Sequence, residues 1–278
     1  MINVLKNFAS GPIVYITPEK IFTFHGIVIT NSVFYGWVSG MILIVTFVLI
    51  ARRVTVRPKG GIIQFVEVGI TYMSNLIESS FEDPERGAKY VPYFISLFFF
   101  LLFNNWLGLL PGVGEAFQSH GNPLLRSFTG DLNATLAVGV VTMGLVYIAS
   151  IKEVGLKEYL KHFFVGNPLN PMYLFLGLIE MLTDTTRVIS LSLRLFLNVT
   201  IGEIVIAVFA YLGGFFAPLT AAPFTLLELF VSALQAYIFV LLSVMYLAIT
   251  VNHAAADHDE DLTDEPVTET MRLQSEKA

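Results

Sequence analysis

An arginine lies in the middle of a long apolar run, where an ionised side chain is costly. Arg194 is flanked by Leu193, Leu195, Phe196 and Leu197. Placing a guanidinium at the centre of a bilayer costs from about 3 to more than about 10 kcal/mol, depending on the reference state. Because such a residue is rarely retained without a partner or a task, Arg194 is the first candidate for a functional residue.

Other polar side chains share one face of the helix that would carry Arg194. With about 100° of rotation per residue, they fall with it in an arc of about 80°. These residues are Glu180, Asp184, Arg187 and Asn198. Glu203 lies nine residues after Arg194 and about 180° round the helix, so it faces different neighbours. The alternative for the three charged members is an interfacial position or pairing with one another.

The composition is that of a membrane protein with several spanning helices. Hydrophobic residues make up 55% of the 278 residues and charged residues 14%, which excludes a soluble domain. A chain of this length can hold five or six membrane helices packed as one unit. Because there is no cysteine, disulfides and thiol chemistry are excluded. No phosphate-binding loop, metal-ligand pair or nucleophile motif occurs, so we predict no cofactor, no metal and no nucleic-acid partner.

The pattern of apolar runs predicts an all-α integral membrane protein with five membrane-crossing helices. One further segment, 60–81, mixes apolar and polar residues and is predicted to be an amphipathic helix in the plane of the membrane. Asp131 is the predicted N-cap of the third crossing helix, and Asn170 with Pro171 begins the fourth. The five crossing helices are predicted at 29–51, 91–110, 131–151, 171–213 and 224–250.

Lysine and arginine are distributed unequally between the two sides of the membrane. The segments on one side carry 3 of these residues and those on the other carry 11. The positive-inside rule therefore places the N-terminus outside and the C-terminus in the cytoplasm. Separately, no cleaved signal peptide is expected. The predicted organisation is an extracytoplasmic segment 1–28, a single membrane domain 29–251 and an acidic, disordered cytoplasmic tail 252–278.

The last two helices are longer than an upright crossing needs. Residues 171–213 would span about 65 Å and 224–250 about 40 Å, against an apolar core of about 30 Å. The first of these helices must be steeply tilted or broken. We expect both to be tilted and to pack antiparallel as a hairpin around Pro218, which suits a curved partner surface.

This hairpin sorts the polar residues by depth. In the last helix Glu228, Ser232 and Gln235 share one face, because they are spaced at i, i+4 and i+7. Counting from the turn predicts an outer acid cluster, a central cation and a cytoplasmic acid cluster. These are Glu203 with Glu228, Arg194 with Gln235, and Glu180 with Asp184.

Such an order suits ion conduction through two separate clefts. Carboxylates in wet clefts take up and release protons, whereas a guanidinium keeps its proton and blocks continuous proton flow. Arg194 is therefore predicted to be an electrostatic gate that stabilises a passing carboxylate in its ionised form. No unpaired buried carboxylate is adjacent to it in the chain, so a partner subunit is expected to bring one.

The motif around Arg194 resembles one protein family. Ser190-Leu-Ser-Leu-Arg-Leu-Phe196, followed by Asn198 and Gly202-Glu203, is similar to subunit a of the F-type ATP synthase. The resemblance covers nearly all of the chain from about residue 31 to 251. It includes Asn105 before Leu-Leu-Pro111, Asp131-Leu-Asn-Ala-Thr-Leu136 and Leu234-Gln-Ala-Tyr-Ile-Phe239.

The resemblance implies a function, partners and residue roles. Subunit a borders a rotating ring of c subunits and supplies two offset half-channels, so that proton flow drives rotation and ATP synthesis elsewhere in the complex. It implies a non-catalytic subunit of a bacterial-type inner membrane that contacts the c-ring, peripheral-stalk subunit b and lipid. Carried over by position, the gate would be Arg194 with Gln235. The outer half-channel would contain Glu203, Glu228, Asn105 and Ser232, and the cytoplasmic one Glu180 and Asp184.

Three positions depart from the family's pattern. Leu197 stands where the family usually has glycine, and Ile201 replaces a usual small residue one turn later. With Asn198, these residues would set how closely the helix packs against the ring. Glu228 stands where the family often has histidine, so two acids are expected to share the outer site.

Two other function classes compete with this reading. A self-contained transporter would usually show internal repeats or matching broken helices in two halves, and none is visible. A structural scaffold would leave Arg194 unexplained. The sequence therefore predicts an ion-translocating stator subunit of a rotary ATP synthase, with the proton as the expected ion; ring residues outside this chain decide between proton and sodium.

Overall fold

The chain is almost entirely helical in the part that the structure, a computed structural model, describes. This part comprises residues 20–24, 27–53, 61–110, 118–119, 122–123, 126–155 and 171–275. The helices are α2 (Asn31–Arg53), α3 (Ile62–Ser79), α4 (Pro84–Ala88), α5 (Val91–Gly108), α6 (Leu132–Val154), α8 (Pro171–Gly213), the 3-10 helix η1 (Gly214–Phe216) and α9 (Ala217–Ser275). Two short antiparallel hairpins, which were not predicted, pair β1 (Lys20–Phe24) with β2 (Ile27–Thr30) and β3 (Gln118–Ser119) with β4 (Asn122–Pro123).

Several of these helices are suited to a membrane. Within the described residues, four stretches are long and apolar enough to cross one: α2, α5, α6 and a continuous stretch Thr185–Asn252. This confirms the predicted all-α, multi-pass membrane class. The last stretch includes parts of both α8 and α9, which the sequence analysis counted as two crossings, so the number of five crossings stays a prediction.

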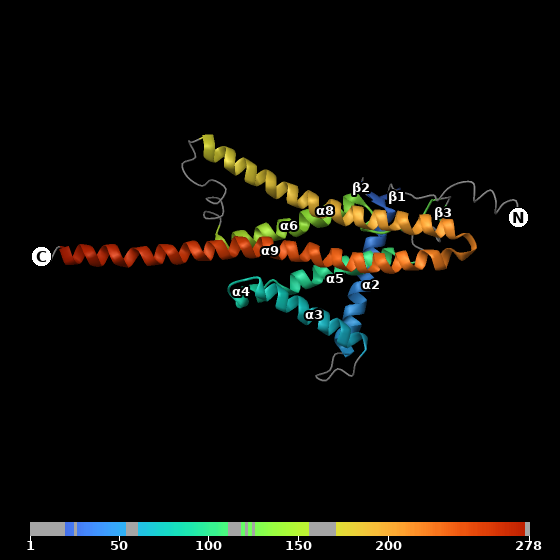
Figure 1. The fold of residues 1–278 in the computed structure, drawn as a ribbon, viewed down its shortest axis with the longest axis horizontal. Helices are drawn as coiled ribbons and strands as arrows, with labels where there is room; N and C mark the ends of the chain where they lie inside the picture. The colour runs from blue at the N-terminus through green and yellow to red at the C-terminus, as the bar shows by residue number, and fades with distance from the viewer. Residues whose placement is uncertain are drawn as a thin grey trace.

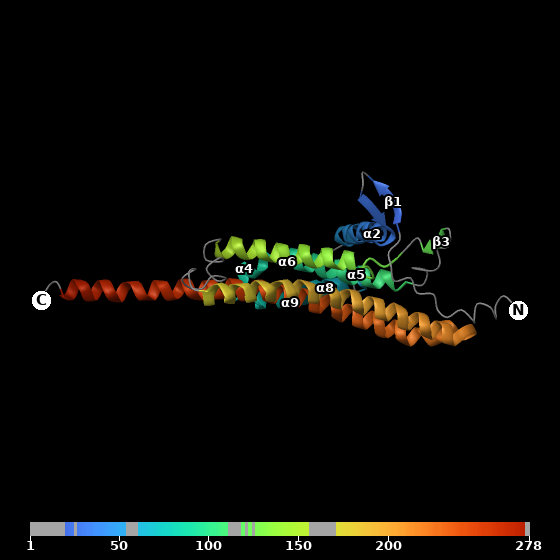
Figure 2. The ribbon, with the colours of Figure 1, turned by 90° about the horizontal axis from the view of Figure 1, so that it is seen from above.

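Four helices run in one general direction, and α2 lies across them. Figure 1 and Figure 2 show α5, α6, α8 and α9 side by side, with α8 packed along α9 as the predicted antiparallel hairpin. α2 is attached to α5 by two hydrogen bonds. Ser39 Oγ donates to Asn104 Oδ1 at 2.5 Å, and Tyr35 OH donates to Leu107 O at 2.8 Å. The remaining surface of α2 is apolar and largely exposed, with Met41 at 69%, as expected of a lipid-facing helix.

The interior consists of two apolar clusters. One joins Met73 of α3 to Val244 of α9, and the other joins Leu101 of α5, Leu195 of α8 and Phe239 of α9. Because lipid is as apolar as these side chains, close packing and interhelical hydrogen bonds hold such helices together more than the hydrophobic effect does. Core positions with small side chains, which let helix backbones approach closely, therefore contribute most to helix packing.

Helix α3 covers most of the segment 60–81, which the sequence predicts to be an amphipathic helix. Met73 and Ile77 are buried against α9, while Phe65 and Tyr72 are 72% and 57% exposed. One face of the helix thus packs on the protein, and the other presents apolar and aromatic side chains outward. Its position in the plane of the membrane stays a prediction.

Most predicted helix ends agree with the structure. Asp131 caps α6, since its carboxylate accepts a hydrogen bond from Asn133 N at 3.0 Å. α8 begins at Pro171 and ends at Gly213, and the next residue, Gly214, has a φ of 54° that favours glycine. The first crossing helix begins at Asn31 instead of residue 29, because the preceding residues pair with β1 in a hairpin.

Helix α9 differs from the prediction at both ends. It begins at Ala217 instead of residue 224, because Pro218 lies in the first turn, where backbone N–H groups have no helical acceptor. Pro223 then removes one hydrogen bond inside the helix. At the other end α9 continues to Ser275, beyond the end of the crossing helix predicted at residue 250. Pro266 removes one backbone hydrogen bond in this segment, and the predicted disorder of the tail 252–278 stays a prediction.

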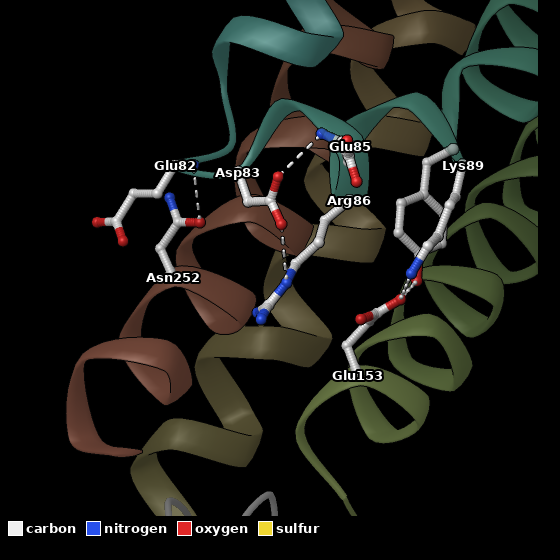
Figure 3. A network of polar contacts seen from close by, with 8 residues as sticks. Glu82, Asp83, Glu85, Arg86, Lys89, Glu153 and Asn252 are labelled. Atoms are coloured by element: carbon white, nitrogen blue, oxygen red, sulfur yellow. Dashed lines mark hydrogen bonds and ion pairs between the residues drawn. The ribbon is translucent and has the colours of Figure 1, made fainter. Parts of the chain in front are cut away.

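A polar network ties the turn between α3 and α5 to α6 and α9. Lys89 and Glu153 point toward each other in Figure 3, with Nζ 3.5 Å from Oε1. Tyr90 OH donates to the same carboxylate oxygen at 2.9 Å, and Glu82 N donates to Asn252 Oδ1 at 3.3 Å (Figure 3). Burial, together with the nearby Glu153 carboxylate, raises the pKa of Tyr90 to about 12.

Candidate functional site

Arg194 lies in an open groove on the surface of the α8–α9 pair. Successive turns of α8 line most of the groove, and α9 contributes one residue, Gln235. The lining residues are Thr186, Ile189, Ser190, Leu193, Arg194, Leu197, Asn198, Ile201 and Gln235. The structure therefore brings the predicted gate pair, Arg194 and Gln235, into one groove. It also places there the three residues predicted to pack against the ring: Leu197, Asn198 and Ile201.

The groove presents one cation on an apolar surface. Arg194 is exposed, and the side chains of Leu193, Leu197 and Ile201 around it are 36%, 47% and 55% exposed. Within the described residues no ion pair involves Arg194. A guanidinium held in apolar surroundings without an internal counter-ion is suited to a carboxylate carried by another protein.

Two amides beside Arg194 have donor groups that the described part of the chain does not use. Gln235 is 6% exposed, and its Nε2 has no hydrogen-bond partner there; the same is true of Asn198 Nδ2. Leaving a buried donor unsatisfied costs about 1–3 kcal/mol. These donors are therefore expected to bind water or a partner's acceptor group.

A second polar group lies along α9 toward the hairpin turn. Glu228 is buried, with 5% exposure, and Ser232 Oγ donates to its Oε1 at 3.4 Å. Asn105 of α5 donates through Nδ2 to the backbone oxygen of Ser232 at 3.4 Å. Three residues that the sequence analysis assigned to the outer half-channel are thus in contact in the folded chain.

Glu203 reaches this group from the neighbouring helix, α8. A Cβ built on Gly130, which precedes α6, would lie 3.4 Å from Glu203 Oε1. A Cβ built on Gly202 would collide with the Glu228 carboxyl group. Because neither glycine has a side chain, both carboxyl groups lie close against backbone, and the fourth predicted member of the outer half-channel joins the other three.

A buried arginine that the sequence analysis did not single out lies beside Glu203. Arg126 is 5% exposed, and its Nη2 donates to Gly130 O at 2.8 Å. Burial lowers the pKa of its guanidinium, and the carboxylates of Glu203 and Asp131 oppose that effect. One signal was available in the sequence, since Arg126 is the single lysine or arginine of the 111–131 segment.

The predicted cytoplasmic acids are at the other end of α8. Glu180 and Asp184 belong to this helix, but their side chains lie outside the described residues. One turn on, the Arg187 guanidinium carbon lies 4.6 Å from the centre of the Tyr246 ring. In the described part of the chain, no three histidine, aspartate or glutamate side chains converge as metal ligands.

Comparisons with known proteins show which family the chain belongs to. A family model described as "ATP synthase A chain" matches residues 33–248. The chain is 34% identical over 241 residues to "ATP synthase subunit a" of Syntrophobacter fumaroxidans, covering 85% of this chain and 91% of that protein. It is 31% identical over 247 residues to the subunit a of Myxococcus xanthus, covering 84% and 77%. With that of Sulfurihydrogenibium sp. it shares 33% identity over 210 residues, covering 76% and 91%.

The matched residues include the Arg194 groove and the outer acid cluster. They also include every crossing helix predicted from the sequence apart from the first and last few residues. The resemblance that rested on the motif around Arg194 is therefore confirmed across most of the chain. The chain belongs to the ATP synthase A chain family, as a membrane-sector subunit of the F-type ATP synthase.

Proposed function

We propose that this subunit conducts protons through two offset half-channels that meet a rotating ring of c subunits at Arg194. Proton flow through them turns the ring, and rotation drives ATP synthesis elsewhere in the complex. The subunit is not catalytic by itself. Its other contacts are with the peripheral-stalk subunit b and with lipid.

One observation carries this proposal: Arg194 is an exposed cation on an apolar face and forms no ion pair within the described residues. An ionised carboxylate of the ring would be stabilised opposite the guanidinium, because opposite charges within about 4–6 Å favour the ionised form. Since a guanidinium keeps its proton at physiological pH, Arg194 cannot relay protons. It separates the two half-channels and opposes a short circuit between them.

The outer half-channel is assigned to Asn105, Glu203, Glu228 and Ser232. The hydrogen bonds that join Asn105, Ser232 and Glu228 lead along one face of α9 toward Gln235, which lines the Arg194 groove. A proton taken up by these carboxylates could thus reach a ring carboxylate beside Arg194. The cytoplasmic half-channel is assigned to Glu180 and Asp184, on the part of α8 beyond Arg194 from the hairpin.

The orientation follows from the distribution of basic residues. We assign the N-terminus to the outside and the C-terminus to the cytoplasm, because the segments on one side carry 3 lysine and arginine residues and those on the other 11. The tilted α8–α9 pair then presents the groove of Arg194 to the ring near mid-depth.

The test is ATP-driven proton pumping by the whole complex in membrane vesicles that carry Arg194→Ala at normal assembly levels. We expect coupled pumping to be lost while ATP hydrolysis sites remain intact, and passive proton leak to rise. Arg86→Ala is the matched control, because Arg86 is an exposed arginine that pairs with Asp83 at 3.5 Å, away from the groove. Pumping that survives Arg194→Ala would show that Arg194 is structural and would overturn the proposal.

A further inference from the structure

The outer acid cluster contains a buried cation that the half-channel assignment does not use. Arg126 lies between β4 and α6, is 5% exposed, and donates from Nη2 to Gly130 O at 2.8 Å. Removing a guanidinium from water costs several kcal/mol unless charges of opposite sign compensate it. The residues that surround Arg126 therefore decide what it does.

Arg126 and Glu203 both lie against Gly130. Arg126 binds the backbone oxygen of Gly130, and a Cβ built on the same residue would lie 3.4 and 3.5 Å from the two carboxylate oxygens of Glu203. The electrostatic interaction between the two side chains is attractive, while Glu228 repels Glu203 from α9. Glu203 thus interacts with one cation and one acid that come from different elements.

The other acid near Arg126 already has its own hydrogen bonds. Ser32 Oγ donates to Asp131 Oδ2 at 2.5 Å, and Asn133 N donates to Asp131 Oδ1 at 3.0 Å as part of the α6 cap. These two hydrogen bonds stabilise the Asp131 carboxylate in addition to its attraction to Arg126. Of the two acids that the described residues place near the guanidinium, Glu203 therefore depends more on Arg126 for the stability of its ionised form.

We propose that Arg126 is the counter-ion of Glu203, a positioning residue that sets the pH at which the outer half-channel releases and takes up protons. This role rests on the proposed function, because it assigns Glu203 to proton conduction. Arg126 does not itself carry protons. It favours the ionised carboxylate against the repulsion from Glu228 and keeps the carboxyl group over Gly130.

The test uses the whole complex reconstituted in proteoliposomes, with the pH on the outer side varied while the other side is fixed. Arg126→Gln removes the charge but keeps a hydrogen-bond donor for Gly130 O. Without the cation the ionised form of Glu203 is less favourable, so we expect half-maximal proton conduction to move to higher outer pH by about 1–3 units. Arg126→Lys keeps the charge and is expected to restore most of the profile, and Arg86→Gln is the matched control without a shift.

A second comparison keeps the proposal testable when Arg126→Gln impairs assembly. In that case Arg126→Gln combined with Glu203→Gln removes both charges and is expected to restore assembly. Failure of the double variant to assemble, where Glu203→Gln alone does assemble, would show that Arg126 holds the loop for another reason. Among variants that assemble, an unchanged pH profile in Arg126→Gln overturns the inference. If Arg194→Ala still abolishes pumping in the same vesicles, the proposed function stands without it.

Discussion

Glu228 of α9 occupies the space that any side chain at residue 202 of α8 would need. A Cβ added to Gly202 would collide with the Glu228 carboxyl group, and the next residue is Glu203. Tight packing of α9 on α8 at Gly202 therefore occurs next to Glu203, the other acid of the outer cluster. Gly202 is therefore needed for the packing of α8 on α9, and it adjoins both acids to which we assign proton conduction.

Gly202→Ala should displace Glu228 and impair proton pumping. The added methyl group overpacks the contact, which typically costs about 1–3 kcal/mol. The measurement is ATP-driven pumping and the thermal inactivation midpoint of the purified complex. Gly144→Ala on α6 is the control, because nothing lies within 4 Å of a Cβ at that position. Adding Glu228→Ala should restore the thermal midpoint but not pumping; a normal midpoint in Gly202→Ala alone would contradict the contact.

Gly139→Ala should destabilise the packing of α6 on α8. Adding Ser192→Ala to that variant should remove the steric clash and restore the packing. A Cβ at Gly139 would collide with the Ser192 hydroxyl group but would lie 3.5 Å from Ser192 Cβ, an ordinary contact distance. We expect the single variant to lose about 1–3 kcal/mol of stability and the double variant to regain most of it. Thermal inactivation of the complex measures both. Two additive losses would mean that the residues do not meet as described.

Tyr90→Phe should weaken the network around Glu153 in a pH-dependent way. Because the pKa of Tyr90 is raised from 10.0 to about 12 in the folded chain, its stabilising contribution is complete below pH 10 and is lost as the pH rises through 12. Below pH 10 the lost hydrogen bond is worth about 0.5–1.5 kcal/mol. The difference in thermal midpoint between wild type and Tyr90→Phe should therefore shrink as the pH rises from 9 to 12. A constant difference over that range would count against the shifted pKa.

Tyr246→Leu should remove the contact that stabilises the Arg187 side chain of α8 and so lower the stability of the complex, whereas Tyr246→Phe should not. The guanidinium carbon of Arg187 lies 4.6 Å from the centre of the Tyr246 ring, within the range of a cation–π interaction worth about 0.5–2 kcal/mol. Phenylalanine keeps the ring face and leucine removes it. Thermal midpoints of the three complexes provide the measurement, and equal losses for both variants would assign the effect to the hydroxyl group instead.

The sequence was most informative where local rules dominate. Asp131 as N-cap, the start at Pro171 and the end at Gly213 all follow from backbone hydrogen bonding within one or two turns, and the structure has them. The start predicted for α9 is wrong because Pro218 and Pro223 suggest a helix boundary, although Pro218 fits the first turn of a helix. The β1–β2 hairpin was missed because Ile27–Thr30 continues the apolar run that follows it.

The residues of the candidate site likewise divide into those that local sequence rules could place and those that they could not. Helical periodicity placed Arg194 and Asn198 on one face, since positions on one helix are fixed by rotation per residue, and both line the groove; Leu197 and Ile201, which the resemblance singled out, line it as well. Periodicity also placed Glu228, Ser232 and Gln235 on one face of α9. The two faces were expected to lie together because a short connection between two long helices makes them pack as an antiparallel hairpin.

Sequence alone thus determined the membrane class, the family and the residues that two adjacent helices carry on each face. Only the tertiary structure decided that Arg126, from a loop, lies near Glu203. It also decided that the Glu228 carboxyl group packs against Gly202 and the Glu203 carboxyl group against Gly130. The physical reason is the separation along the chain over which each rule acts. Periodicity and capping act within a few turns, whereas these contacts join segments far apart in the chain and depend on how closely backbones without side chains can approach.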